Sequence, residues 1–236
     1  MKKVGLYFGT FNPIHVGHLI ISNYMVGYTN LDEVWFVVSP LNPLKKKESL
    51  LEDYHRLNLV RIAIEQNPKL KACNEEFNLP IPSYTINTLT HLKEKYSRYE
   101  FNLIMGEDNL RSFKKWKNHE EILKYHHLYV YPRVLTEQEK LDKNNLESKV
   151  DDPKVIRCEA PVMKISSSFI RKAISENKDV RYLLTPEVGT PSNGLFPLPC
   201  ARRMSLFFAS FIALTFSEII AFSVGPDWSI ISIRLR

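Results

Sequence analysis

The stretch VGLYFGTFNPIHVGHL, residues 4–19, holds the features that decide the fold. It starts with a short apolar run, residues 4–8, whose length and composition predict a buried β-strand. Gly9 and the pair Asn12–Pro13 then interrupt the strand and predict a turn. An apolar pattern with helical spacing follows the turn. A helix that begins directly after a glycine turn presents free backbone N–H groups and the positive end of its dipole, and it therefore favours an anion.

Two histidines lie three residues apart where this helix is expected to begin. Their ring nitrogens are hydrogen-bond donors that suit phosphate oxygens, and Gly17 between them leaves room for a ligand to approach the backbone. A single histidine is more often an ordinary surface or core residue, and a histidine pair also suits zinc. No carboxylate or thiol near His15 and His18 in the sequence completes a zinc site. We therefore predict a phosphate site and no metal held by protein ligands.

Short apolar runs alternate with helical patterns along much of the chain. This alternation predicts an α/β fold, namely a Rossmann-like, doubly wound and mostly parallel sheet with helices on both faces. The GxGxxG fingerprint of dehydrogenases is missing from the sequence. Ligands of such sheets bind at the carboxyl ends of the strands. The further candidate strands are residues 33–39, 69–73, 101–106, 126–131 and 154–158.

A second helix start, ISSSFIR at residues 165–171, carries similar chemistry. Serine hydroxyls, free N–H groups and the guanidinium of Arg171 converge there, which predicts a second phosphate site. Capping alone explains the serines, but it does not require Arg171.

Other candidates have equally good structural explanations. Asp108 follows the candidate strand 101–106 and suits a ribose hydroxyl or a hydrated magnesium ion, or it caps the next helix. The lysines of residues 45–47 follow a proline-rich strand end, where a solvated loop is the alternative. Ser83 or Thr85 is expected to cap a helix that runs to about residue 96. His55 and Arg56 are expected at the surface or behind the residues that touch substrate.

Four motifs together resemble the nucleotidylyltransferase superfamily, and within it the nicotinate-nucleotide adenylyltransferases: GTFNPIHVGHL (9–19), SYTINTL (83–89), GEDNLRSFKKW (106–116) and ISSSFIR. The resemblance covers residues 1–188. It implies a transfer of the adenylyl group of ATP to nicotinate mononucleotide, which gives nicotinate adenine dinucleotide and pyrophosphate for NAD biosynthesis. Mg²⁺ would be bound mainly through the ATP phosphates. Another nucleotidylyltransferase, of the pantetheine-phosphate or cytidylyl type, and an inactive or membrane-anchored relative are the alternatives.

The resemblance also implies roles for individual residues. Trp116 would stack on the pyridine ring, and the helix start at residues 83–85 would favour a carboxylate over a neutral amide. Leu44 stands where the family has a histidine, which weakens the match of the adjacent lysines. The implied catalytic residues are His15, His18 and Arg171; the ATP and phosphate site comprises Gly9, Thr10, Phe11, Gly17, Asp108, Ser167 and Ser168; the nicotinate mononucleotide site comprises Lys45, Tyr84, Thr85 and Trp116.

Composition fits a cytoplasmic enzyme of this kind. The chain has 236 residues and a formal net charge of +6, which anionic small substrates explain as well as nucleic acid does. No arginine-rich arm or RNP-like motif occurs, so we expect no nucleic-acid partner. Cys73, Cys158 and Cys200 lie far apart and form no CxxC pattern, which indicates reduced thiols.

The resemblance stops at about residue 188, and we expect an atypical apolar tail over residues 189–236. Residues 204–224 are mostly apolar with Arg202 and Arg203 in front, which allows a transmembrane helix. Glu218 and four serines within the run disfavour membrane insertion. An altered terminus from a shifted reading frame is the favoured explanation, with a membrane anchor and a packed terminal element as the alternatives.

Overall fold

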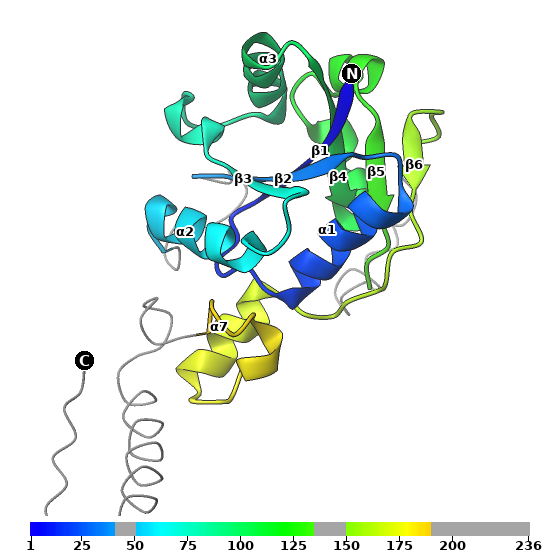
Figure 1. Ribbon diagram of the computed structural model, residues 1–236. Coiled ribbons are helices and arrows are strands. Elements are labelled where there is room, and N and C mark those ends of the chain that lie inside the picture. The colour runs from blue at the N-terminus through cyan, green and yellow to red at the C-terminus, as the bar shows by residue number, and fades with distance from the viewer. Residues whose placement is uncertain (41–50, 135–149, 190–236) are drawn as a thin grey trace, which may run out of the picture.

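The computed structural model describes residues 1–40, 51–134 and 150–189. In this part of the chain, six strands form one sheet in the order β3-β2-β1-β4-β5-β6 (Figure 1), and each neighbouring pair is parallel. The predicted doubly wound sheet is confirmed. The strands are β1 (Lys2–Gly9), β2 (Glu33–Val38), β3 (Leu70–Cys73), β4 (Tyr99–Gly106), β5 (Leu128–Tyr131) and β6 (Val155–Arg157).

Helices cover both faces of the sheet, and each face has its own apolar core. Figure 1 shows α1 and α2 on one side of the strands and α3 on the other. The first core belongs to α1 (Val16–Tyr28), α2 (Asp53–Ile64) and α7 (Ser167–Ser175). The second belongs to α3 (Thr85–Lys95), α4 (Glu107–Ser112) and α5 (His119–Tyr125). Short 3₁₀ turns are η1 (Glu75–Asn78), η2 (Phe113–Lys115) and η4 (Arg181–Leu183).

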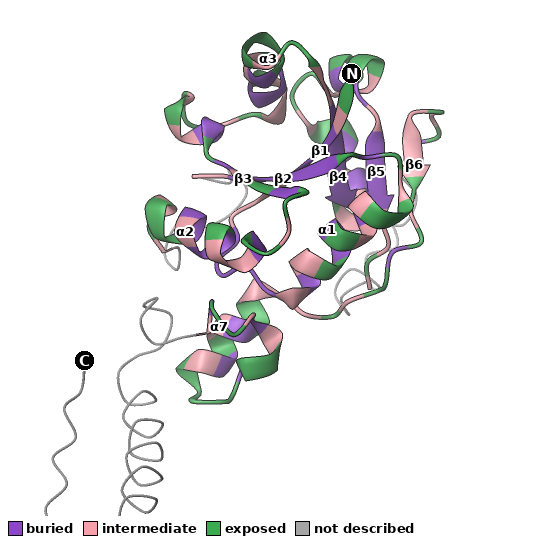
Figure 2. Cartoon of the chain, viewed as in Figure 1, coloured by how far each residue is buried: buried purple, intermediate pink, exposed green. Residues whose placement is uncertain are grey.

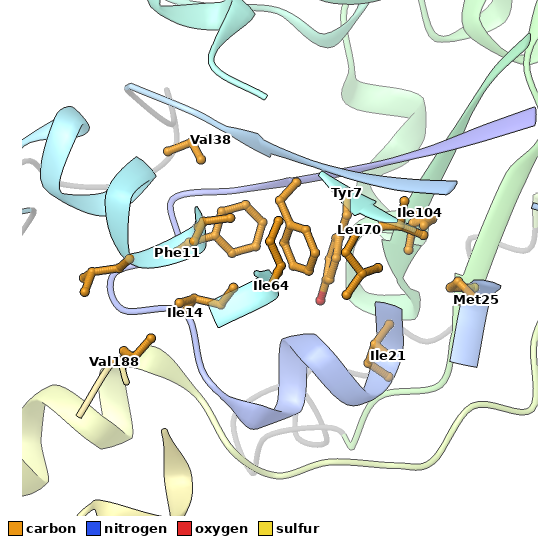
Figure 3. Close-up of a cluster of buried hydrophobic side chains, with 14 of the residues drawn as sticks. Tyr7, Phe11, Ile14, Ile21, Met25, Val38, Ile64, Leu70, Ile104 and Val188 are labelled. Carbon is orange, nitrogen blue, oxygen red and sulfur yellow. The ribbon is translucent and has the colours of Figure 1, made fainter. Parts of the chain in front are cut away.

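The central strands are apolar on both sides because both faces are covered. All six residues of β2 are buried, and Figure 2 shows buried residues gathered in the central strands, whereas the edge strand β6 has none. Along β1, Leu6 contributes to one core and Tyr7 to the other, as the alternation of side chains in a strand requires. Figure 3 shows Tyr7 and Phe11 inside the first core, which extends as far as Val188.

The strand order reverses at β1, which pairs with β2 on one side and with β4 on the other. In an open α/β sheet, the crevice outside the carboxyl ends of the strands at such a point is where ligands bind. The turn of residues 9–13 therefore lies where the fold provides a binding site.

Several expectations fall on residues that lie outside the described part of the chain. These residues are the lysines 45–47, Cys200 and the tail from residue 190 onward, which includes the apolar segment 204–224. Across residues 1–40, 51–134 and 150–189, no helix is long and apolar enough to cross a membrane.

Candidate active site

A cavity of about 300 Å³ lies at the carboxyl ends of β1, β4 and β5, facing the N-terminus of α7. Nine of the predicted residues line it together, although residues 9 and 171 lie far apart in the sequence. Four that were predicted do not line it: Asp108, Tyr84, Thr85 and Trp116. The predicted residues that line it are Gly9, Thr10, Phe11, His15, Gly17, His18, Ser167, Ser168 and Arg171.

The turn after β1 has an unusual backbone. Phe11 has a φ of 44°, in the left-handed region that bulky residues rarely adopt, and the Asn12–Pro13 peptide bond is cis. The Phe11 side chain folds back over Gly9, where an added Cβ would lie 2.9 Å from the ring. Phe11 is 2% exposed, and its ring meets the His18 ring edge-on, with centroids 5.1 Å apart. Phe11 therefore supports the His18 ring from the core, and a larger residue than Gly9 would push the Phe11 ring out of this position.

Helix α7 docks on this turn through side chains at its own N-terminus. Arg171 Nη1 donates to the backbone oxygen of Asn12 at 2.7 Å, and Ser167 Oγ donates to that of Pro13 at 2.9 Å. Ser166 is the N-cap, and its Oγ accepts from Phe169 N at 3.1 Å. The predicted serine cap is thus confirmed at Ser166. The contacts hold the N-terminal end of α7, which favours anions, against the cavity.

The two histidines stack on one another at the start of α1. Their ring centroids are 3.7 Å apart with an interplanar angle of 27°. The backbone N–H of His15 donates to Nδ1 of His18 at 3.3 Å. An accepting ring nitrogen carries no proton, so a neutral His18 carries its proton on Nε2 and can donate from there. Gly17 permits the stack, because a Cβ there would lie 3.0 Å from Nδ1 of His15.

His15 is held as a neutral ring. Burial lowers the pKa of His15 from its ordinary value of 6.5 to about 4. The residue is 5% exposed, and its Nδ1 is a buried atom without a hydrogen-bond partner in the described residues. A neutral, buried imidazole at pH 7 supports the stacked His18 without adding charge repulsion.

This pKa predicts how stability depends on pH. The unfolded state binds a proton at His15 near pH 6.5 and the folded state only near pH 4, so stability is fully present above pH 6.5 and falls as the pH drops toward 4. Between pH 7 and pH 5 we expect His15 to account for a loss of about 2 kcal/mol in the free energy of unfolding. Urea unfolding of wild type and of His15→Asn at both pH values measures it. An equal loss in both proteins would contradict the assignment.

Asp108 does not line the cavity itself, but it contacts Arg133, which does. The two side chains form an ion pair, and Arg133 lines the cavity together with Asn109. The second carboxylate oxygen, Oδ1, is buried without a hydrogen-bond partner among the described residues. An added Cβ at Gly106 would lie 2.4 Å from that oxygen, so a larger residue there would displace the carboxylate. An unpartnered acceptor at this edge fits a hydroxyl donor of a ligand.

Several lining residues were not predicted from the sequence. Arg133 lies two residues after the end of β5, and a cation just past a strand end was the signal that could have revealed it. Tyr7 and Tyr131 line the cavity with their hydroxyl oxygens 3.1 Å apart. Burial raises the pKa of Tyr7 well above its ordinary value of 10.0, so this hydroxyl stays protonated. An apolar strand position gave no signal for a polar role of Tyr7.

Among the described residues predicted to contact nicotinate, Trp116 packs against the second core, and Tyr84 and Thr85 lie at the start of α3. Trp116 packs on Phe113 with ring centroids 5.5 Å apart, and Lys117 Nζ lies 4.6 Å from the Tyr84 ring centroid. The prediction that Ser83 or Thr85 caps α3 is wrong, because the N-cap is Tyr84 and no side chain caps it. Ser83 Oγ donates instead to the buried carboxylate of Glu76 at 3.3 Å. A buried carboxylate needs such a donor, and this explains why the Ser83 hydroxyl does not cap the helix.

No three His, Cys, Asp or Glu side chains of the described ranges are grouped so that they could hold a metal ion. A metal at this site therefore needs most of its ligands from a bound phosphate or from water.

Together these features place two helix N-termini, two histidines and an arginine around one cavity at the switch point of a doubly wound sheet, where folds of this kind bind ligands. Residues 6–173 match the cytidylyltransferase-like family, which spans most of the described fold. A protein of Plasmodium falciparum described as "nicotinic acid mononucleotide adenylyltransferase complexed with NaAD" has the same fold. Its TM-score is 0.61 at 21% identity, with 80% of this chain and 93% of that chain covered.

Relatives with higher sequence identity show to which group within this family the chain belongs. A Flavobacterium psychrophilum protein named "Probable nicotinate-nucleotide adenylyltransferase" is 54% identical over 186 residues, which are 79% of this chain and 93% of the relative. A protein of the same name from Christiangramia forsetii is 52% identical over 192 residues, with the same two shares covered. The chain belongs to the cytidylyltransferase-like family of nucleotidyltransferases and, within it, to the nicotinate-nucleotide adenylyltransferases.

Proposed function

We propose that this cavity transfers the adenylyl group of ATP to nicotinate mononucleotide and releases pyrophosphate. The observation that carries the proposal is that His18, Arg171 and the serines at the N-terminus of α7 line one cavity. These are donors and positive dipoles from two helix starts, and a chain of phosphates can span them. The identity of the two substrates is inferred from the family to which the chain belongs.

The reaction needs no nucleophile from the protein. The phosphate of the mononucleotide attacks the α-phosphorus of ATP, the new P–O bond forms, and the bond to the leaving pyrophosphate breaks on the opposite side. His18 donates from Nε2 to an α-phosphate oxygen, while Ser168, Arg171 and the α7 N–H groups bind the β- and γ-phosphates. Catalysis then consists of positioning and of stabilising charge in the transition state.

Mg²⁺ fits this site as a partner of the phosphates. When bound, it neutralises charge on the triphosphate. The ion would be held mainly through the phosphates and would keep several of its waters. Asp108, whose buried Oδ1 has no partner among the described residues, would accept a hydrogen bond from one of these waters.

The acceptor site is proposed at Tyr84, Thr85 and Trp116, with Trp116 stacked on the pyridine ring. Replacing Trp116 by Ala should raise KM for nicotinate mononucleotide by about tenfold and leave KM for ATP unchanged, since a stacking contact is worth about 1 kcal/mol or more. Trp116→Phe keeps an aromatic face and should recover most of the affinity. Equal KM values in wild type and Trp116→Ala would remove this residue from the site.

The experiment that tests the function is an acceptor panel. The full chain receives ATP and Mg²⁺ with nicotinate mononucleotide, nicotinamide mononucleotide or 4′-phosphopantetheine, and pyrophosphate release is followed. We expect nicotinate mononucleotide to give the highest kcat/KM. A higher value with 4′-phosphopantetheine would assign the chain to a different nucleotidylyltransferase.

A further inference from the structure

Arg56 on α2 is fully buried although it carries a charge. None of its surface is exposed, whereas the neighbouring His55 is mostly exposed, as expected. A guanidinium is rarely buried unless its N–H groups are paired, because removing a charge from water is costly. Arg56 does not line the cavity, and the reaction described above gives it no role.

The partners of Arg56 come from three separate segments. Its Nη1 donates to the backbone oxygen of Thr10 at 2.6 Å and to that of Ser39 at 3.0 Å. Its Nε donates to the backbone oxygen of Leu51 at 3.0 Å, and its Nη2 pairs with the carboxylate of Asp53. One side chain therefore joins the turn after β1, the end of β2 and the start of α2.

The turn that Arg56 holds contains the left-handed Phe11. A bulky residue keeps such a backbone only where its surroundings enforce it. Arg56 binds the carbonyl of Thr10, the residue before Phe11, and Arg171 binds the carbonyl of Asn12, the residue after it. In a planar trans peptide the C=O and N–H groups point in opposite directions. The bond from Arg56 to Thr10 O therefore directs the N–H of Phe11 away from α2.

We propose that Arg56 is a positioning residue for adenylyl transfer. It fixes the Thr10–Phe11 peptide so that the Phe11 N–H faces the phosphates bound in the cavity, and it does not touch substrate itself. This inference rests on the proposed function. A lysine cannot replace Arg56, because a single ammonium group does not reach all the acceptors that surround the planar guanidinium.

The test compares Arg56→Lys with a destabilised control. Ile122→Ala removes a fully buried side chain from the core on the other face of the sheet, away from the turn. Both variants are assayed for kcat and KM at a temperature well below their Tm. Hydrogen exchange of the Phe11 N–H, measured by NMR without substrates, gives a readout that does not depend on activity.

We expect kcat of Arg56→Lys to fall on the order of 10²-fold with KM for ATP changed much less, because misplaced groups cost catalysis more than binding. The Phe11 N–H should exchange faster in this variant and not in Ile122→Ala. If Arg56→Lys does not fold, Asp53→Asn weakens the same hold and should give a smaller loss of kcat.

Two results would overturn the proposal: a kcat for Arg56→Lys within twofold of wild type, or an equal fall of kcat in Ile122→Ala. If wild type itself released no pyrophosphate from ATP and nicotinate mononucleotide, the proposed function would fail. The exchange rate of the Phe11 N–H would then decide the role of Arg56: a rate equal to wild type in Arg56→Lys refutes the positioning, and a faster rate supports it.

Discussion

Replacing His18 by Ala should lower kcat on the order of 10²–10³-fold, the scale for losing one donor to charge that develops in a transition state. The Nδ1 of His18 accepts from the His15 backbone, so a neutral His18 carries its proton on Nε2, the atom that we propose donates to the phosphate. The ring is held on two sides, by the His15 stack and by the edge contact with Phe11. Such a fixed donor stabilises charge without reorganising during the reaction.

Steady-state kinetics of His18→Ala beside His55→Ala measure this effect. His55 lies on α2 with a side chain that is 61% exposed, so the same substitution there should leave kcat unchanged. A kcat of His18→Ala within a few-fold of wild type would show that this imidazole does not act on the reacting phosphate.

Replacing Arg171 by Ala should lower kcat/KM for ATP by a similar factor, on the order of 10²–10³. The guanidinium bonds the Asn12 carbonyl and Ser168 Oγ, so it both docks α7 on the turn and carries positive charge to the cavity. Arg171→Lys keeps the charge but loses the fork, and it should recover only part of the activity.

Lys172 is the matched control for this change. It is the next residue on α7, and its side chain is 76% exposed. Lys172→Ala should leave kcat/KM for ATP near the wild-type value. If the two alanine variants lost activity equally, net positive charge on α7 rather than the placed guanidinium would explain the effect.

The fold was predictable because its signals are local and repeat along the chain. Each buried strand is a short apolar run that ends at a glycine, a proline or a polar residue, and helical patterns separate the runs. The parallel order then follows from the alternation of strands and helices. Nine of the residues that line the cavity were also predicted, since GTFNPIHVGHL and ISSSFIR place them at two helix starts.

What the sequence did not reveal depends on long-range packing. Arg56 stands in an ordinary helical pattern, and only the folded chain brings the carbonyls of Thr10 and Ser39 to it. Tyr7 and Arg133 meet the cavity because β1, β4 and β5 are neighbours in the sheet, which no local pattern encodes. The roles proposed for Tyr84, Thr85 and Trp116 come from family resemblance, and the described cavity does not include them.

A crystal structure of the full chain with a non-hydrolysable ATP analogue tests the central claim most directly. The account predicts an α-phosphate oxygen within hydrogen-bond distance of His18 Nε2, at about 3 Å, and the β- and γ-phosphates at Ser168, Arg171 and the N-terminus of α7. A triphosphate bound elsewhere, or bound in this cavity with its α-phosphate beyond the reach of His18, would contradict it.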